Sequence, residues 1–251
     1  MQVDRLTLAE ATQRVLAWTA DASPERCRYV VTPNVDHAVM LQTHARLYDA
    51  YLDASLVVAD GAPLVAAARL LGRRLPERVA GSDLVPAVLA AADAACRAGG
   101  QRTRVFLLGA GPGVAERAAG AIARRWPGVE VVGVDCPPVG FEKCDRQNER
   151  ILEAVRLARP DLLVIGLGAP KQELWVHRFH ERLEAKAAIC AGATIDFLAG
   201  EKRRAPAWMQ RTGLEWLHRL ATEPRRLAKR YATDAWVFPQ LVWREYWGEA
   251  G

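Results

Sequence analysis

The sequence contains no apolar run approaching the ~20 residues that a membrane-spanning helix needs. It also lacks a charged and then apolar N-terminal segment of the kind that directs secretion. Its five cysteines are an odd number, lie far apart and include no CxxC pair, so the pattern indicates neither a disulfide framework nor a cysteine zinc site. These absences favour a cytoplasmic protein with reduced thiols.

The composition excludes a disordered or low-complexity chain. Hydrophobic residues make up 51% and charged residues 25% of the 251 positions, which is typical of a globular protein. The length permits one large domain or two small ones, and it suffices to bury a sizeable core without metals or disulfides.

Positive charge is concentrated in one C-terminal segment. Residues 202–230 carry nine Lys or Arg against two acids, Glu215 and Glu223, within a chain of formal net charge +5. All other positions together carry 25 basic and 27 acidic side chains, a balance of −2. A basic segment of this kind suits a phosphate, an anionic membrane or a nucleic acid.

Six short apolar runs alternate with longer amphipathic or alanine-rich stretches. Strands are predicted over residues 28–31, 56–59, 104–108, 129–132, 161–165 and 187–190. Helices are predicted between them over 36–50, 62–71, 82–98, 112–125, 145–158 and 171–185. This alternation predicts an α/β fold with a mostly parallel sheet and helices on both faces.

The pattern changes near residue 200, where the strand signals end. Helices are predicted over residues 206–220, 224–231 and 234–247. Five of the eight tryptophans fall in the last 51 residues, at Trp208, Trp216, Trp236, Trp243 and Trp247. We therefore predict an α/β core over residues 1–200 and a basic, tryptophan-rich helical appendage over residues 201–251.

Ligands of parallel α/β sheets bind beyond the carboxyl ends of the strands, so we examined the residues that follow each strand. Thr32 and Asn34 follow the first strand, where they serve either as hydrogen-bonding groups or as a helix cap. Asp60 follows the second strand, where a carboxylate can accept a proton from a substrate hydroxyl or simply cap a helix. A sequence suited to an anion comes next, with Arg78, Gly81 and a helix N-cap around Asp83.

The third strand leads into Gly109-Ala110-Gly111-Pro112-Gly113, which is similar to a dinucleotide-binding glycine turn but is not a full GxGxxG motif. Asp135 follows the fourth strand, where a ribose would lie. The turn is compatible with either a nicotinamide cofactor or a nucleotide sugar.

Polar groups are denser after the last two strands than a structural turn requires. Gly168, Lys171, Gln172 and Glu173 follow the fifth strand, and Thr194 and Asp196 follow the sixth. The spacing of Arg204, Arg211 and Arg219 places them near one face of a helix if that helix is continuous, where they could clamp a diphosphate. The alternative interpretation is a solvated basic face.

Other chemistries have little support in the sequence. No DxD pair of metal-binding acids occurs, and no GxSxG or Cys/His nucleophile motif is present. His177 and His180 are three residues apart on a predicted helix without an obvious third ligand, so a zinc site is not expected. We expect no metal.

These motifs together resemble the WecG/TagA/CpsF family of glycosyltransferases, also classified as glycosyltransferase family 26. The matching pieces occur in family order over nearly the whole chain: Thr32-Pro33-Asn34, Ala59-Asp60-Gly61, Arg78 to Asp83, Gly168 to Glu173 with Trp175, Gly192 to Asp196, and Arg204 to Arg225.

The resemblance implies a Rossmann-like core that transfers a sugar from a UDP-sugar to a polyprenyl-diphosphate-linked saccharide. It implies an inverting, metal-independent reaction without a cofactor, at the inner face of the membrane, in the synthesis of a cell-surface polysaccharide. The donor sugar would be N-acetylmannosamine, its uronic acid or glucose. By position, Asp60 matches the proposed base, Thr32 a residue that supports the reaction centre, and Gln172 the sugar-site motif. The basic segment matches an appendage that completes the site at the membrane.

Two alternatives remain open at this point. One is an NAD(P)-dependent oxidoreductase that uses Gly109 to Gly113. The other is a non-enzymatic nucleotide-binding module whose basic tail binds lipid or nucleic acid. The leading interpretation predicts a UDP-sugar, a polyprenyl-diphosphate-linked acceptor and an anionic membrane surface as partners, and no nucleic acid. It leaves open whether copies of the chain associate.

Overall fold

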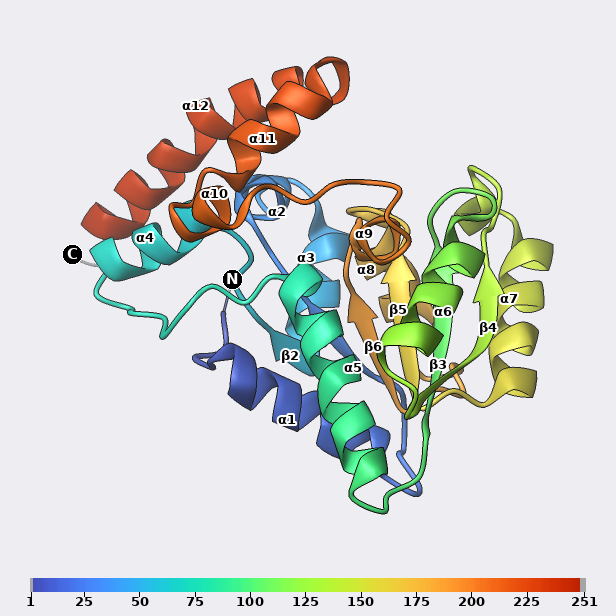
Figure 1. Ribbon diagram of the computed structural model, residues 1–251. Helices are drawn as coiled ribbons and strands as arrows, with labels where there is room; N and C mark the ends of the chain where they lie inside the picture. The colour runs from blue at the N-terminus through green and yellow to red at the C-terminus, as the bar shows by residue number, and fades with distance from the viewer. Residues whose placement is uncertain (1, 249–251) are drawn as a thin grey trace.

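The computed structural model describes residues 2–248, apart from the side chains of Ala207, Arg211 and Arg226. Within that range the strands form one fully parallel six-stranded sheet in the order β2-β1-β6-β5-β3-β4 (Figure 1). The strands are β1 (Arg28–Val31), β2 (Leu56–Val57), β3 (Thr103–Gly109), β4 (Val129–Asp135), β5 (Leu162–Gly166) and β6 (Ala187–Cys190). The predicted fold class and all six predicted strands are confirmed.

Helices cover both faces of the sheet, so successive strand residues are buried on opposite sides. In β5, Leu162 and Val164 belong to one hydrophobic cluster, whereas Leu163 and Ile165 belong to the other. This arrangement explains why the strands read as continuous apolar runs. The first cluster packs under α1 (Leu8–Thr19), α5 (Gly81–Arg97), α6 (Val114–Arg125) and α9 (Thr194–Leu198). The second packs under α3 (Ala45–Leu52), α7 (Asp145–Ala158) and α8 (Lys171–Phe179).

Three helix predictions need correction. The predicted helix 36–50 is two helices, α2 (Val35–Met40) and α3, because the His44 side chain accepts a hydrogen bond from Leu47 N and starts a new helix. Helix α8 ends at Phe179, well before residue 185. The sequence analysis missed α1 altogether, although Thr7 and Glu10 form a capping box that is visible in the sequence.

The C-terminal segment is helical, as predicted, but its breaks lie elsewhere. It forms α10 (Ala207–Arg211), α11 (Glu215–Thr222) and α12 (Pro224–Gly248). The predicted helix 206–220 is interrupted at Gly213, whose φ of +76° is left-handed, whereas the two helices predicted after residue 224 are one. Arg204 precedes α10, so the continuous helix face predicted for Arg204, Arg211 and Arg219 is wrong.

The C-terminal helices lie across the carboxyl edge of the sheet, beside α2 and α4 (Ala62–Leu70) (Figure 1). Leu227 and Ala205 are buried and anchor this segment. The short helix η1 (Phe141–Lys143) precedes α7 on the far side of the sheet. No helix within residues 2–248 is both long and apolar enough to cross a bilayer.

Candidate functional site

The turn that follows β1 and the turn that follows β2 are joined directly, because these two strands are neighbours in the sheet. The Asp60 amide donates a hydrogen bond to the carbonyl of Pro33 (2.7 Å), which ties the turn after β2 to the turn after β1. Thr32 Oγ1 donates to the carbonyl of Cys190 on β6 (3.2 Å). Three adjacent strand ends therefore place Asp60 and Thr32 in one region, as the parallel sheet predicts.

Asp60 does not cap the helix that follows it. Gly61 occupies the cap position of α4, and no side chain bonds to the first amides of that helix. The Asp60 side chain is 24% exposed and lines a pocket of about 280 Å³. Burial raises the pKa of Asp60, and the nearby positive charges of Arg219 and Arg78 only partly oppose this rise. A carboxylate with a raised pKa, open to a pocket, is suited to accept a proton.

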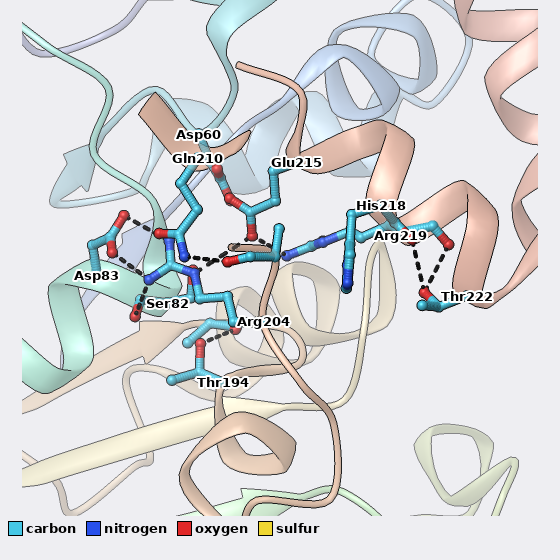
Figure 2. Close-up of polar contacts among 12 residues, drawn as sticks. Asp60, Ser82, Asp83, Thr194, Arg204, Gln210, Glu215, His218, Arg219 and Thr222 are labelled. Atoms are coloured by element: carbon cyan, nitrogen blue, oxygen red, sulfur yellow. Dashed lines mark hydrogen bonds and ion pairs between the residues drawn. The ribbon is translucent and has the colours of Figure 1, made fainter. Parts of the chain in front are cut away.

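Three arginines from separate parts of the chain converge on the carboxylate of Glu215, and Figure 2 shows two of them, Arg204 and Arg219, with Glu215 and Asp60. Arg78 lies 3.6 Å from Asp60 Oδ1 and 2.9 Å from Asp83 Oδ2. Arg204 holds both oxygens of Asp83, with Nη2 2.9 Å from Oδ2. Arg219, on α11, comes from the other side of the pocket. The structure thus brings together Arg78, Asp83, Arg204 and Arg219; the side chain of Arg211 lies outside the described residues.

Glu215 is the site residue that the sequence analysis missed. Its carboxylate lies 3.3 Å from Arg78 Nη1, and 3.5 Å from both Arg204 Nε and Arg219 Nη2. One carboxylate therefore bridges three guanidinium groups, which shows that a single anionic group can reach all of them. This role could not be predicted, because Glu215 was one of two acids in a basic segment and its position within the family motif does not name its partners.

Close backbone packing shapes the start of α5. A Cβ atom on Gly81 would lie 3.1 Å from Ala191 Cα and 3.3 Å from Thr32 Oγ1, so Gly81 lets this helix approach β6 and Thr32. The predicted N-cap around Asp83 is wrong, because Ala80 occupies the cap position and no side chain caps the helix. Asp83 instead holds Arg78 and Arg204 in place.

The glycine turn after β3 has a packing explanation. Gly109 has a φ of +119°, and a Cβ atom there would lie 2.4 Å from the carbonyl oxygen of Gly166 on β5. The Gly111 carbonyl accepts a hydrogen bond from the first amide of α6. Both Asp135 oxygens are bound by Arg150, at 2.6 and 3.0 Å, so this carboxylate is not presented to a ribose. The oxidoreductase alternative thereby loses its expected ribose ligand.

Gln172 and Glu173 make internal contacts. Gln172 is 3% exposed, and its oxygen accepts hydrogen bonds from the amides of Gly168 (3.3 Å) and Gly192 (3.2 Å). Its nitrogen donates to Glu173 (2.8 Å), which is 1% exposed and lies 3.4 Å from His37 Nε2. Gln172 therefore joins the turns after β5 and β6.

The remaining predicted site residues lie on the same edge of the sheet with differing roles. Asn34 caps α2 through its side chain, which accepts from the amide of His37. Lys171 begins α8 and is half-buried. Thr194 is buried and donates to the carbonyl of Ala191 (2.6 Å), whereas burial raises the pKa of the half-exposed Asp196. Of these, Asn34, Lys171 and Asp196 are half-buried, and Asn34 lines the Asp60 pocket.

Gln172→Ala should destabilise the protein. The substitution removes three hydrogen bonds and leaves the buried carboxylate of Glu173 without its amide donor, a loss of about 2–4 kcal/mol. Thermal unfolding should show Tm lower by several degrees. Gln13→Ala on the exposed side of α1 is the matched control and should leave Tm nearly unchanged. An unaltered Tm in Gln172→Ala would show that these bonds do not hold the turns.

A third potential metal ligand does exist beside the two histidines, contrary to the sequence analysis. Asp53 Oδ2 lies 3.0 Å from His180 Nε2 and 3.6 Å from His177 Nδ1. The Arg26 guanidinium already contacts this group, 3.0 Å from Asp53 and 3.1 Å from His180. The carbonyl of His180 accepts a hydrogen bond from the amide of Cys27, the residue that precedes β1. The cluster therefore lies at the amino edge of the sheet, at the opposite end of the strands from Asp60.

Comparisons with known proteins agree with this geometry. The sequence model of the family described as "Glycosyl transferase WecG/TagA/CpsF family" matches residues 1–250. An N-acetylglucosaminyldiphosphoundecaprenol N-acetyl-beta-D-mannosaminyltransferase of Staphylococcus aureus (strain MRSA252) is 27% identical over 90% of this chain and 84% of its own. The protein of the same name from Bacillus spizizenii is 29% identical over 83% of this chain and 77% of its own. The chain belongs to the WecG/TagA/CpsF glycosyltransferase family.

Proposed function

We propose that this protein transfers N-acetylmannosamine from its UDP derivative to a saccharide carried on polyprenyl diphosphate, with inversion at the anomeric carbon. The observation that carries the proposal is the Asp60 carboxylate, which lines a pocket together with Arg78 and Arg219, while Glu215 joins these two arginines to Arg204. The names of the two relatives supply the transferred sugar and the lipid-linked acceptor. The family supports the class of reaction.

The chemistry divides between the carboxylate and the arginines. Asp60 takes the proton from the acceptor hydroxyl as that oxygen bonds to the anomeric carbon of the donor. The bond from this carbon to the UDP oxygen breaks on the opposite side, and the electron pair leaves with UDP. The negative charge that develops on the diphosphate is stabilised by guanidinium groups, which Arg78, Arg204 and Arg219 provide.

Glu215 has a defined place in this scheme. Before the donor binds, its carboxylate is a counter-ion shared by the three arginines that the diphosphate would contact, two of which also pair with Asp83. Donor binding exchanges this internal counter-ion for a more highly charged one, so the arginines need not be held unpaired in a partly buried site.

The proposal is tested by ligand binding and by transfer together. UDP should raise Tm saturably and NAD(H) should not, because a ligand that binds only the folded state stabilises it. Labelled sugar should pass from UDP-N-acetylmannosamine to N-acetylglucosaminyl diphosphate carrying a short prenyl chain, with the uronic acid and glucose donors run in parallel. NAD(H) stabilisation without any UDP effect would instead favour an oxidoreductase.

EDTA should leave transfer unchanged. We propose a metal-independent reaction because the positive charges of Arg78 and Arg219 lie near Asp60 and the sequence has no DxD motif. The measurement is the initial rate with EDTA and with added Mg²⁺ or Mn²⁺, after dialysis against the chelator. Loss of activity in EDTA that Mg²⁺ or Mn²⁺ restores would contradict the prediction.

We further propose that residues 201–251 hold the protein on the anionic inner face of the membrane. Trp236, Trp243 and Trp247 are 75%, 66% and 56% exposed, so packing onto the core does not account for them. Tryptophan favours the headgroup region, and basic side chains favour anionic lipid. A lipid-linked acceptor would be met at this surface.

A further inference from the structure

Two hollows lie end to end between α2, α4 and α12. The Asp60 pocket is bounded by the first residues of α2 and α4 and by the middle of α12. A larger groove of about 810 Å³ is bounded by the last residues of α2 and α4 and by the later turns of α12. Phe238 lines both. The groove therefore continues the site along the direction of these helices.

The walls that α2, α4 and α12 give the groove are apolar, whereas the N-terminal residues Asp4 and Arg5 add polar side chains to its lining. Its apolar lining includes Leu41, Leu64, Leu71, Phe238, Leu241 and Val242. On α4, the small residues Ala67 and Ala68 also line the groove and leave its volume open. The ion pair between Arg73 and Glu245 (3.1 Å) stands at one side of it. A volume of this size is within the range of pockets that bind small organic ligands.

We propose that this groove binds the first isoprene units of the acceptor, while the acceptor's sugar and diphosphate occupy the pocket at Asp60. This inference rests on the proposed function, because it needs an acceptor with a polar head and a hydrocarbon tail. The two hollows match such a molecule in their order. The pocket at Asp60 offers a carboxylate and arginines to the polar head, and the adjoining groove offers apolar side chains to the tail. At a rise of about 1.5 Å per residue, the nine residues of α4 give this path a length of roughly 14 Å.

A hydrocarbon chain suits the groove better than a protein segment does. An extended peptide would bury backbone N–H and C=O groups against the apolar side chains of α2, α4 and α12, at a cost for each group that finds no polar partner. A prenyl chain carries no such groups. The groove also runs beside the turns of α12 on which Trp243 and Trp247 are exposed. The rest of the chain would therefore leave the protein at the surface that we expect to meet the membrane.

The test is a series of N-acetylglucosaminyl diphosphates whose prenyl tails grow one isoprene unit at a time, assayed without membrane or detergent and below their aggregation concentration. For the unmodified protein, KM should fall by about tenfold or more across the series and then level off when the groove is full, because each buried carbon adds to binding. Ala67→Trp, which fills the groove, should abolish most of this dependence.

The matched control is Ala66→Trp, since Ala66 is exposed on the same helix and does not line the groove. It should keep the full chain-length dependence. Ala67→Leu fills less space and should give an intermediate dependence if Ala67→Trp does not fold. If KM depends on prenyl chain length to the same extent in the unmodified protein and in folded Ala67→Trp or Ala67→Leu, the groove does not bind the prenyl chain. Transfer to the shortest acceptor tests the proposed function separately, because it does not require the groove.

Discussion

Asp60→Asn should lower kcat by about a hundredfold or more, which is the usual scale for loss of a general base. The amide has nearly the same size and keeps the pocket intact, but it cannot accept the acceptor's proton. UDP should still raise Tm in the variant, because the arginines are unchanged. The measurement is the initial transfer rate at saturating donor, together with UDP-dependent thermal shifts.

The pH profile distinguishes this role from a structural one. Because burial raises the pKa of Asp60, the base becomes protonated as pH falls through a range above that of an ordinary carboxyl group. The unmodified enzyme should therefore lose activity on the acidic side earlier than an exposed aspartate would. The residual rate of Asp60→Asn should not show this loss of activity at acidic pH. Turnover near normal in the variant would exclude Asp60 as the base.

Two companion measurements sharpen the result. A carboxyl group whose pKa is raised by folding destabilises the folded state when it is ionised, so Asp60→Asn should keep or raise Tm at neutral pH. Thr32→Ala should slow turnover less than Asp60→Asn does. It removes a hydroxyl that bonds to the carbonyl of Cys190 and leaves the base in place.

Truncation after Gly200 should abolish both transfer and liposome binding. It removes Arg204, Arg219 and Glu215 from the site and takes away the wall that α11 and α12 give the pocket. It also removes ten basic residues, each of which contributes about 1 kcal/mol near an anionic surface. Co-sedimentation with anionic vesicles and transfer to a water-soluble acceptor measure the two losses independently.

Two controls separate anchoring from catalysis. Circular dichroism should show a folded truncated core, because both hydrophobic clusters of the sheet come almost wholly from residues before 201. In the full chain, Arg219→Ala should reduce turnover but leave vesicle binding nearly intact, since it removes only one of the ten basic side chains after residue 200. Full activity of the truncated core on the soluble acceptor would show that the appendage serves only as an anchor.

The sequence predicted best what depends on local pattern. Runs such as Leu162 to Ile165 are apolar on both faces because both faces are buried, so the parallel sheet could be read directly. Parallel strands then placed Thr32 and Asp60 at one edge without any knowledge of contacts. The helix break at Gly213 was equally visible in principle, but helical periodicity on both sides of it outweighed a single glycine.

What the sequence could not show are the partners of polar side chains. Nothing in the order of residues indicates that Glu215 faces Arg78, which lies far away along the chain. Gln172 stood in a motif that suggested sugar contact, yet its amide is fully used by two turns and by Glu173. Asp53 completes a cluster with two histidines only because α3 and α8 pack side by side. Such pairings arise from tertiary packing.

The close approach of the strand ends has a consequence for how this enzyme could diverge. At Gly109 a Cβ atom would collide with the carbonyl of Gly166, and at Gly81 it would lie 3.1 Å from Ala191 Cα, so backbone packs closely against backbone at these two points. Peptide groups offer the same donors and acceptors whatever the sequence, so these two positions have little means of telling one sugar from its epimer. A new sugar preference would therefore have to arise at the rim, at positions such as Lys171 or in α11 and α12. Substitutions there leave the buried core untouched, so donor choice can change without a loss of folding stability.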